Sequence, residues 1–510
     1  MTLIKNNKRL YTVAFGLIMA LAVILRAGKF VFYGGGLNQD EASIGYDAWA
    51  LLHYGIDRNG VSMPVHLIAW GSGQNAMYAY LSMPFIAIFG LTALSVRAVN
   101  LIAGIGAVAS VYFICKNLFE RRTAFCAMAL TAAAPWHIML STWGLESNLL
   151  PSMFIFALLL LVKSFKHAWL ICPSAAVFSL CLYTYGSAYV AVPIFMLVAV
   201  IVILRKKLVP LKWIIAAFVV FVTVSVPIGL FVLVNKLGWE SINIGPLTIP
   251  AMTGEARINL MTGSFSLKSV IKSIWDNVVL QNDGQSRNAL PVYGCFYVMS
   301  LPFTVAGFIK AARRHCAGDL FALAGVLGGL CIFFVLSDVN INRVNFIYMP
   351  LIILTSIGFT EIIDSKRSAV AVVCAYAVML SGFTAKFYGR EYTNQIENEF
   401  FVSFDEAIEY ADQISADSST VHVTGSVNMP YIYVLFYTRE DPNEYIKTAV
   451  IENPRVQFQF VNSFGKWVFN TDGFENTEPG IYIVENSAIN ENTICTTVRQ
   501  FEKYTVVTID

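Results

Sequence analysis

The chain has 510 residues, of which 56% are hydrophobic and only 13% are charged, and its mean hydropathy is +0.61. Soluble domains carry about a quarter charged residues, so this composition excludes an ordinary soluble protein and indicates a polytopic membrane protein. The net charge of +2 is no sign of nucleic-acid binding, because the basic residues lie in short clusters between apolar runs, and no nucleic-acid partner is expected.

Eleven apolar runs approach the roughly 20 residues that an α-helix needs to cross a bilayer. We predict spanning helices near residues 10–32, 93–115, 123–141, 147–163, 168–185, 187–204, 212–235, 291–309, 319–336, 344–363 and 368–386. Basic residues precede the first run, but no small-residue cleavage site follows it, which favours a retained helix over a signal peptide. A shorter run at residues 76–90, interrupted by Pro84, is ambiguous between spanning, re-entrant and surface-lying.

The distribution of Lys and Arg indicates whether the run at 76–90 crosses the membrane, because cytoplasmic loops carry an excess of basic residues. If this run does not cross, every later basic cluster falls on the cytoplasmic side; if it crosses, all of them fall outside. The sequence therefore predicts a cell-membrane protein with a cytoplasmic N-terminus. Long outer loops are expected at about 33–92 and 236–290, and the C-terminal part is expected outside the cytoplasm.

The predicted fold is mainly α: a bundle of about eleven spans over residues 1–388, followed by a small extracytoplasmic α/β domain at residues 389–510. Within this domain, periodicity predicts a helix over Asp405–Ile414. Strands are predicted over Val421–Thr424, Tyr431–Tyr437, Gly480–Glu485 and Tyr504–Ile509. The sequence contains no nucleotide-binding fingerprint or P-loop, which argues against ATP or a nucleotide sugar as substrate.

The stretch Asn38-Gln39-Asp40-Glu41 follows the first span on the predicted outer side. Helical periodicity continues to Tyr54 and places Asp40 and Asp47 on a polar face, which predicts a helix lying along the bilayer with its apolar side down. Glu41 points about 100° away from Asp40, so Asp40 is favoured for an open site, with Glu41 as its support. In the structural alternative, Asn38 caps the helix and both carboxylates complement its dipole.

Three further polar clusters lie at predicted outer ends of spans. His137 and Glu146 are candidates for substrate binding because ionisable residues at membrane depth are costly, although His137 could equally make one interfacial hydrogen bond. Tyr183 and Tyr185 are weaker candidates, since tyrosine is common at bilayer interfaces. Arg343 opens a span, where it either binds a phosphate through its planar guanidinium or extends toward the interface.

Less certain alternatives for contacting a phosphate are Arg58, Arg97 and Arg257. Together, carboxylates and an arginine on one face suit the transfer of a sugar from a membrane-anchored donor: a carboxylate takes the proton of an acceptor hydroxyl, and an arginine stabilises the departing phosphate. The alternative is a transporter or flippase of lipid-linked or small polar solutes. A transporter should carry charged or broken helices near the midplane, whereas the polar residues here gather at one face.

Several stretches, in this order and spacing, resemble the polytopic GT-C glycosyltransferases, specifically bacterial relatives of protein O-mannosyltransferases and of the lipid A aminoarabinose transferase. These stretches are residues 38–41, 45–48, 91–100, 135–138 and 182–185. The resemblance implies transfer of a sugar from a polyprenyl-phosphate donor in the membrane lipid to a cell-envelope glycan, lipid or protein, on the outer face and with inversion at the anomeric carbon.

The resemblance also implies roles for individual residues. Asp40 corresponds to the catalytic base, Glu41 completes the acidic pair, and Glu146 corresponds to a second acidic position. Arg343 is placed like an arginine that contacts the lipid phosphate. The family often carries a Lys-Pro-Pro-Leu stretch where residues 73–78 here lack the lysine. Some relatives hold a divalent metal ion near these acids, but no ligand set in the sequence demands one, so no cofactor is assigned.

Overall fold

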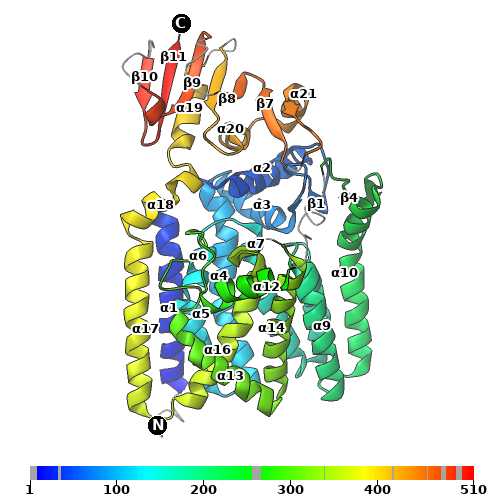
Figure 1. Ribbon diagram of the computed structural model, residues 1–510. Coiled ribbons are helices and arrows are strands. Elements are labelled where there is room, and N and C mark those ends of the chain that lie inside the picture. The colour runs from blue at the N-terminus through cyan, green and yellow to red at the C-terminus, as the bar shows by residue number, and fades with distance from the viewer. Residues whose placement is uncertain are drawn as a thin grey trace. The chain divides into compact units, whose positions relative to one another are not determined.

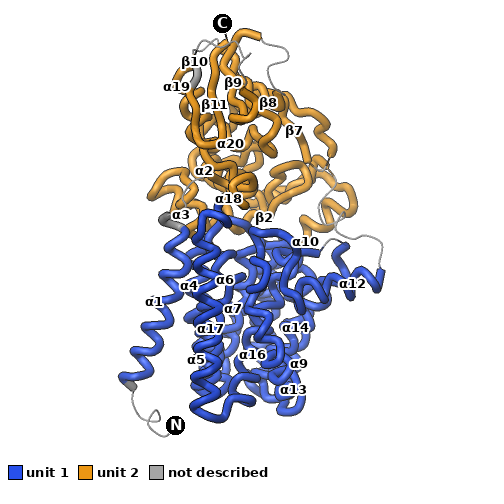
Figure 2. The backbone as a smooth tube through the Cα atoms, turned by 60° about the vertical axis from the view of Figure 1, so that its left-hand side comes forward, with its two compact units in different colours: residues 1–32, 99–227, 261–393 blue, residues 33–98, 228–260, 394–510 orange. Residues whose placement is uncertain are grey.

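The computed structural model describes most of the chain (Figure 1). The described residues are 8–32, 36–254, 266–337, 339–415, 419–456, 458–471, 478–489 and 497–509. They form two compact units, each assembled from segments that are distant in sequence (Figure 2). Unit 1 comprises residues 1–32, 99–227 and 261–393, and unit 2 comprises residues 33–98, 228–260 and 394–510.

Eight helices among the described residues are long and apolar enough to cross a membrane. They are α1 (Lys8–Phe32), α4 (Ala93–Leu118), α7 (Glu146–Ser164), α9 (Ala188–Arg205), α10 (Leu211–Leu237), α14 (Ala317–Val335), the pair α15 (Ile341–Val344) and α16 (Tyr348–Ile362), and α17 (Lys366–Phe387). Each coincides with a predicted span, which makes the chain a multi-pass membrane protein with a mainly α fold.

The other three predicted spans correspond to shorter helices. Residues 123–141 form α5 (Arg121–Ala133) and α6 (Pro135–Leu140), residues 168–185 form a 3-10 turn and α8 (Ile171–Cys181), and residues 291–309 form turns followed by α13 (Leu301–Arg314). Among the described residues, eight of the eleven predicted spans are thus helices of membrane length, and three are divided into shorter segments. Continuous apolar composition predicted these three spans but did not predict where the helices break.

The break between α5 and α6 has a clear cause in Pro135, which has no N–H to donate to the carbonyl of Thr131. Arg26 of α1, fully buried, donates instead to the carbonyl oxygens of Thr131 and Ala132, each at 3.1 Å. The hydroxyl of Tyr297 donates to the next carbonyl, that of Ala133, at 2.9 Å. These side chains satisfy the carbonyl groups that the proline leaves at the end of α5.

Close backbone contact joins α13 to α16 in unit 1. A Cβ atom on Gly307 would lie 1.8 Å from the carbonyl oxygen of Leu354, and one on Gly358 would lie 1.8 Å from the carbonyl oxygen of Phe303. Only glycine permits this approach, and small residues are the usual means by which membrane helices pack closely. α12 (Leu267–Ile274) also belongs to this unit.

Unit 2 combines α2 (Gln39–Tyr54) and α3 (Met77–Phe89) with two short hairpins and the C-terminal part of the chain. The hairpins are β1 (His66–Leu67) with β2 (Gln74–Asn75), and β3 (Ile242–Ile244) with β4 (Leu247–Ile249). The ambiguous run at 76–90 is the 13-residue α3, which is shorter than a spanning helix. Residues 41–51 of α2 are buried on every side, so the prediction of a helix with one face on lipid and one in water is wrong.

The C-terminal part of unit 2 is built on a seven-stranded sheet with strand order β10-β11-β9-β5-β8-β7-β6 (Figure 1). The central strand β5 is parallel to β8 and β9, whereas the other pairs are antiparallel. The strands are β5 (Val421–Thr424), β6 (Val450–Glu452), β7 (Phe460–Phe464), β8 (Trp467–Thr471), β9 (Gly480–Glu485), β10 (Thr497–Gln500) and β11 (Tyr504–Ile509). The helices are α18 (Arg390–Phe400), α19 (Phe404–Ile414), α20 (Pro430–Thr438) and α21 (Pro442–Thr448).

The predicted elements of this part are confirmed in four of five cases. The helix over Asp405–Ile414 and the strands over Val421–Thr424, Gly480–Glu485 and Tyr504–Ile509 match α19, β5, β9 and β11. The strand over Tyr431–Tyr437 is wrong, because this stretch is the helix α20. Its aromatic and β-branched residues favour a strand, but Pro430 starts a helix and burial of nearly every side chain removes the contrast between faces.

Candidate active site

The first turn of α2 is fixed by a capping box at Asn38. The Asn38 side-chain oxygen accepts a hydrogen bond from the N–H of Asp40 at 3.1 Å, and the carboxylate of Glu41 accepts from the N–H of Asn38 at 3.0 Å. These bonds satisfy main-chain donors that a helix N-terminus otherwise leaves unpaired. The capping role considered for Asn38 is therefore confirmed, and it fixes Asp40 within the first turn.

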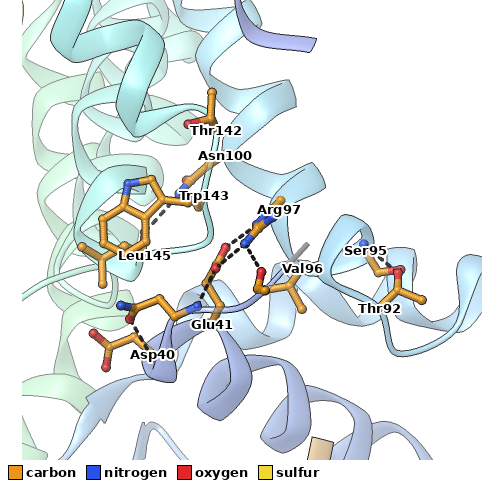
Figure 3. Close-up of polar contacts among 12 residues, drawn as sticks. Asp40, Glu41, Thr92, Ser95, Val96, Arg97, Asn100, Thr142, Trp143 and Leu145 are labelled. Carbon is orange, nitrogen blue, oxygen red and sulfur yellow. Dashed lines mark hydrogen bonds and ion pairs between the residues drawn. The ribbon is translucent and has the colours of Figure 1, made fainter. Parts of the chain in front are cut away.

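Glu41 forms a buried ion pair with Arg97 of α4 (Figure 3). The Nε and one terminal nitrogen of Arg97 lie 2.7 and 2.8 Å from the two carboxylate oxygens, and the same terminal nitrogen donates to the carbonyl of Gly36 at 2.8 Å. A two-pronged contact of this kind is the strongest that arginine and a carboxylate make. Arg97, considered above as a phosphate ligand, is thus engaged with Glu41 and the main chain.

Asp40 differs from Glu41 in both exposure and direction. Its side chain is only partly buried, and its carboxylate points away from the pair formed by Glu41 and Arg97 (Figure 3). Two carboxylates that are neighbours in sequence therefore occupy different environments. Glu41 has a structural role in the pair with Arg97, whereas the Asp40 side chain reaches the surface of unit 2 in part.

A second buried cluster in unit 2 contains Arg58. The main-chain N–H of Arg58 donates to Asp47 Oδ1 at 3.1 Å, and one terminal nitrogen of its guanidinium lies 3.6 Å from Asp47 Oδ2. The guanidinium carbon lies 4.7 Å from the centre of the Trp70 ring. Asp57, also buried, accepts from the N–H groups of Asn59 and Val61 at 2.9 Å each. Burial raises the pKa of Asp57 to about 7, with the nearby charge of Asp47 adding to the shift. Arg58 is therefore placed in the interior of unit 2.

His137 lies in α6 of unit 1 and is fully buried. Its Nδ1 is 2.6 Å from a terminal nitrogen of Arg26, which makes Nδ1 the acceptor. Sequence reasoning missed Arg26. The signal that could have revealed it is a lone arginine inside an apolar span, which requires a buried partner.

Glu146 is the first residue of α7 and is buried. Asn100 of α4 holds the turn that leads into it, donating to the carbonyl oxygens of Trp143 and Leu145 at 2.8 and 3.1 Å. The dashed contact of Asn100 is drawn in Figure 3. Sequence reasoning also missed this positioning role of Asn100, because an amide within an apolar helix carries no charge to mark it.

The remaining candidates lie in unit 1. The hydroxyl of Tyr183 donates to the carbonyl of Val224 at 2.7 Å, which joins it to α10, and Tyr185 is buried. Arg343 is half-buried in α15, where its main-chain N–H donates to the side-chain oxygen of Asn340 at 3.0 Å. Arg257 lies outside the described residues.

The structure thus sorts the candidates into two sets. Asp40, Glu41 and Arg58 belong to unit 2, whereas His137, Glu146, Tyr183, Tyr185 and Arg343 belong to unit 1. In the part of the chain that the structure describes, no three His, Cys, Asp or Glu side chains are grouped so as to hold a metal ion.

The bundle of membrane-length helices and the α/β unit have a GT-C-like fold, which the chain shares with solved structures of ArnT and AglB. Residues 74–228 match the family model described as dolichyl-phosphate-mannose-protein mannosyltransferase. No sequence among the curated proteins matches the chain.

Two solved proteins illustrate the likeness in fold. ArnT from Cupriavidus metallidurans bound to undecaprenyl phosphate is 13% identical, with a TM-score of 0.58 and 98% of each chain covered. The same protein in the apo state is 14% identical, with a TM-score of 0.55 and the same coverage. The oligosaccharyltransferase AglB from Archaeoglobus fulgidus, in complex with an inhibitory peptide and a dolichol-phosphate, is 11% identical. Its TM-score is 0.51, and the match covers 85% of this chain and 64% of AglB.

Proposed function

We propose that this protein transfers a sugar from a polyprenyl-phosphate donor to a cell-envelope glycan, lipid or protein at the outer face of the membrane. The observation that carries the proposal is the contrast between Asp40 and Glu41 in the first turn of α2. Glu41 is neutralised by Arg97, while the Asp40 carboxylate is partly exposed and points away from that pair. The fold and the matches to proteins solved with undecaprenyl phosphate or dolichol-phosphate support the choice of donor class.

In the proposed reaction, the oxygen of an acceptor hydroxyl attacks the anomeric carbon of the donor sugar while Asp40 takes the hydroxyl proton as general base. The bond between the anomeric carbon and the phosphate oxygen breaks, and its electron pair stays on the polyprenyl phosphate. A single displacement of this kind inverts the configuration at the anomeric carbon. Asp40 sits at the positive end of the α2 dipole, which favours its charged, proton-accepting form.

Arg343 is the proposed contact for the lipid phosphate, because a guanidinium can stabilise the charge that develops as the phosphate departs. Further residues proposed to contact the substrate are Glu146, His137, Tyr183 and Tyr185. Arg58 is the least favoured candidate, since it is paired with Asp47 in the interior of unit 2. These assignments rest on the family resemblance and on the chemistry of the side chains.

A transporter or flippase is the second candidate, and the break between α5 and α6 beside the buried Arg26 is the observation that favours it. Broken helices with charged partners are typical of transporter binding sites. Here Arg26 is occupied by main-chain carbonyls of the break, which gives it a structural role. The sugar transferase is therefore the better supported function.

The test is sugar transfer in membrane vesicles supplied with a set of radiolabelled polyprenyl-phosphate sugars. Wild type is compared with Asp40→Asn and with Asp412→Asn, a matched control on an exposed carboxylate that pairs with Lys466. We expect wild type and the control to consume the donor and Asp40→Asn to lose activity by ~100-fold or more while still inserting in the membrane. If the donor only moves between leaflets without being consumed, the protein is a flippase and the proposal fails.

A further inference from the structure

We propose that the C-terminal part of unit 2, residues 394–510, holds helix α2 in place and thereby positions Asp40. This inference rests on the function proposed above and deepens it, since it assigns a task to a domain whose role the sequence leaves open. The C-terminal part touches the N-terminal side of α2 at three places between residues 36 and 46. All of these contacts lie within unit 2.

The first contact lies just before α2. The Asn38 side-chain amide donates to the carbonyl oxygen of Glu399 at 3.0 Å, so the residue that caps α2 is itself anchored to α18. Gly36 has φ of +68°, and a Cβ atom there would lie 2.1 Å from the carbonyl oxygen of Phe400. Only glycine combines this backbone conformation with this close approach. The chain entering α2 is therefore fitted against the end of α18.

The second contact is adjacent to Asp40 in sequence. The side-chain amide of Asn428 donates to the side-chain oxygen of Gln39. Asn428 lies in the turn that follows β5 and precedes α20, which begins at Pro430. β5 and α20 thus hold Asn428 in place, and Asn428 in turn bonds the first turn of α2.

The third contact lies one to two turns further along α2. A Cβ atom on Gly45 would lie 2.6 Å from the ring of Phe436 and 2.7 Å from the side chain of Val96. The hydroxyl of the next residue, Tyr46, donates to the carbonyl of Glu440 at 2.7 Å. α20 and the start of α4 therefore both pack against α2 at Gly45, where a larger side chain would force its neighbours to move.

These contacts fix the position of α2 within unit 2. The capping box fixes Asp40 relative to its own helix, but it does not fix that helix relative to its surroundings. A displacement of about 1 Å at a reacting group can lower a rate ~100-fold, so the placement of the whole helix matters for a general base. Asn428 and Phe436 are thus positioning residues, which act through α2 and do not touch the reacting atoms.

The experiment compares Phe436→Ala, Phe436→Leu and Asn428→Ala with wild type in the intact protein. Lys447→Ala is the control. Lys447 is an exposed residue of α21, and its substitution removes a surface ion pair with Glu444. We expect Phe436→Ala to lower kcat by ~10-fold or more with KM for the lipid donor within about twofold, and Phe436→Leu to retain most of the rate. Amide hydrogen exchange over residues 39–46 should rise in Phe436→Ala and Asn428→Ala, while exchange in α7 and α14 stays as in wild type.

Two results would overturn this inference. Unchanged exchange over residues 39–46 in both variants would show that the C-terminal part does not hold α2. A rise in exchange without a fall in kcat would show that holding α2 does not position the base. Failure of the proposed function is distinguishable, since in that case Asp40→Asn transfers sugar as wild type does. Exchange over α2 still reports the mechanical contact in that case.

Discussion

Arg97 holds both carboxylate oxygens of Glu41 at 2.7 and 2.8 Å, while the carboxylate of the preceding residue, Asp40, points elsewhere (Figure 3). Neighbouring residues on a helix project about 100° apart, so one helical turn can serve a structural and a chemical task at once. The ion pair anchors α2 to α4, and the position of Asp40 depends on that anchor. Breaking the ion pair between Glu41 and Arg97 therefore tests whether it stabilises the fold.

Arg97→Leu should destabilise the protein by about 3–5 kcal/mol, because it leaves the Glu41 carboxylate buried and unpaired. Thermal unfolding in detergent, followed by tryptophan fluorescence, measures the change. Arg499→Leu, at an exposed arginine stacked on Tyr410, is the control and should change stability by less than about 1 kcal/mol. The double variant Glu41→Leu/Arg97→Leu should recover part of the loss, since no charge then remains buried. Equal stability of Arg97→Leu and wild type would contradict the structural role of the pair.

The sequence was informative where composition alone decides the structure. Runs of apolar residues predicted the eight long helices, and the alternative in which Asn38 caps α2 matches the structure, although the return bond from Glu41 was not predicted. Periodicity failed where packing on all sides removes the contrast between faces. In α20 nearly every residue is buried, so a strand and a helix leave the same apolar pattern, and the aromatic residues tipped the prediction toward a strand.

The partners of buried charges could not be predicted from the sequence, because they depend on contacts between distant segments. The sequence offered Arg97 only as a less certain phosphate contact, and the fold shows that it pairs with Glu41, 56 positions away. Arg26 was missed because its partners are main-chain carbonyls, which every residue carries. The roles of Glu146 and Arg343 stay predictions, since the geometry of a bound substrate is needed to test them.

Arg26 gives a second prediction. Arg26→Leu should destabilise the protein by about 2–4 kcal/mol, because the carbonyl groups of Thr131 and Ala132 lose a charged donor in an apolar environment. Arg26→Lys should recover only part of this loss, since an ammonium cannot reach both carbonyls and His137 with fixed geometry. Thermal unfolding in detergent measures both, with Arg205→Leu at the exposed end of α9 as the control. If Arg26→Lys is as stable as wild type, the charge and not the geometry of the guanidinium is what matters.

The contact between α13 and α16 gives a third prediction. Gly307→Ala places a methyl group where the Leu354 carbonyl oxygen now lies, so the two helices must separate. We expect a loss of several kcal/mol, at or above the ~1–3 kcal/mol typical of overpacking, because the obstacle is backbone and cannot rotate away. Gly229→Ala in α10 is a matched control, since a Cβ atom there meets nothing within 4 Å. Wild-type stability of Gly307→Ala would show that the helices are not in backbone contact.

The last prediction concerns pH and Asp57. Burial raises the pKa of this carboxyl from 3.8 to about 7, so between about pH 4 and pH 7 the folded protein holds a proton that the unfolded chain has released. The free energy of unfolding should therefore fall as the pH rises through this window and level off above about pH 7. Asp47, whose pKa burial also raises, contributes in the same direction, while Arg58 opposes both.

Asp57→Asn isolates the contribution of this group, because an amide keeps an oxygen to accept from Asn59 and Val61 but cannot titrate. The difference in melting temperature between pH 5 and pH 7.5 should be smaller in Asp57→Asn than in wild type. Asp412→Asn, at a more exposed carboxylate, should keep the wild-type difference. An unchanged pH dependence in Asp57→Asn would mean that this carboxyl is ionised in the folded protein, with Arg58 neutralising it together with Asp47.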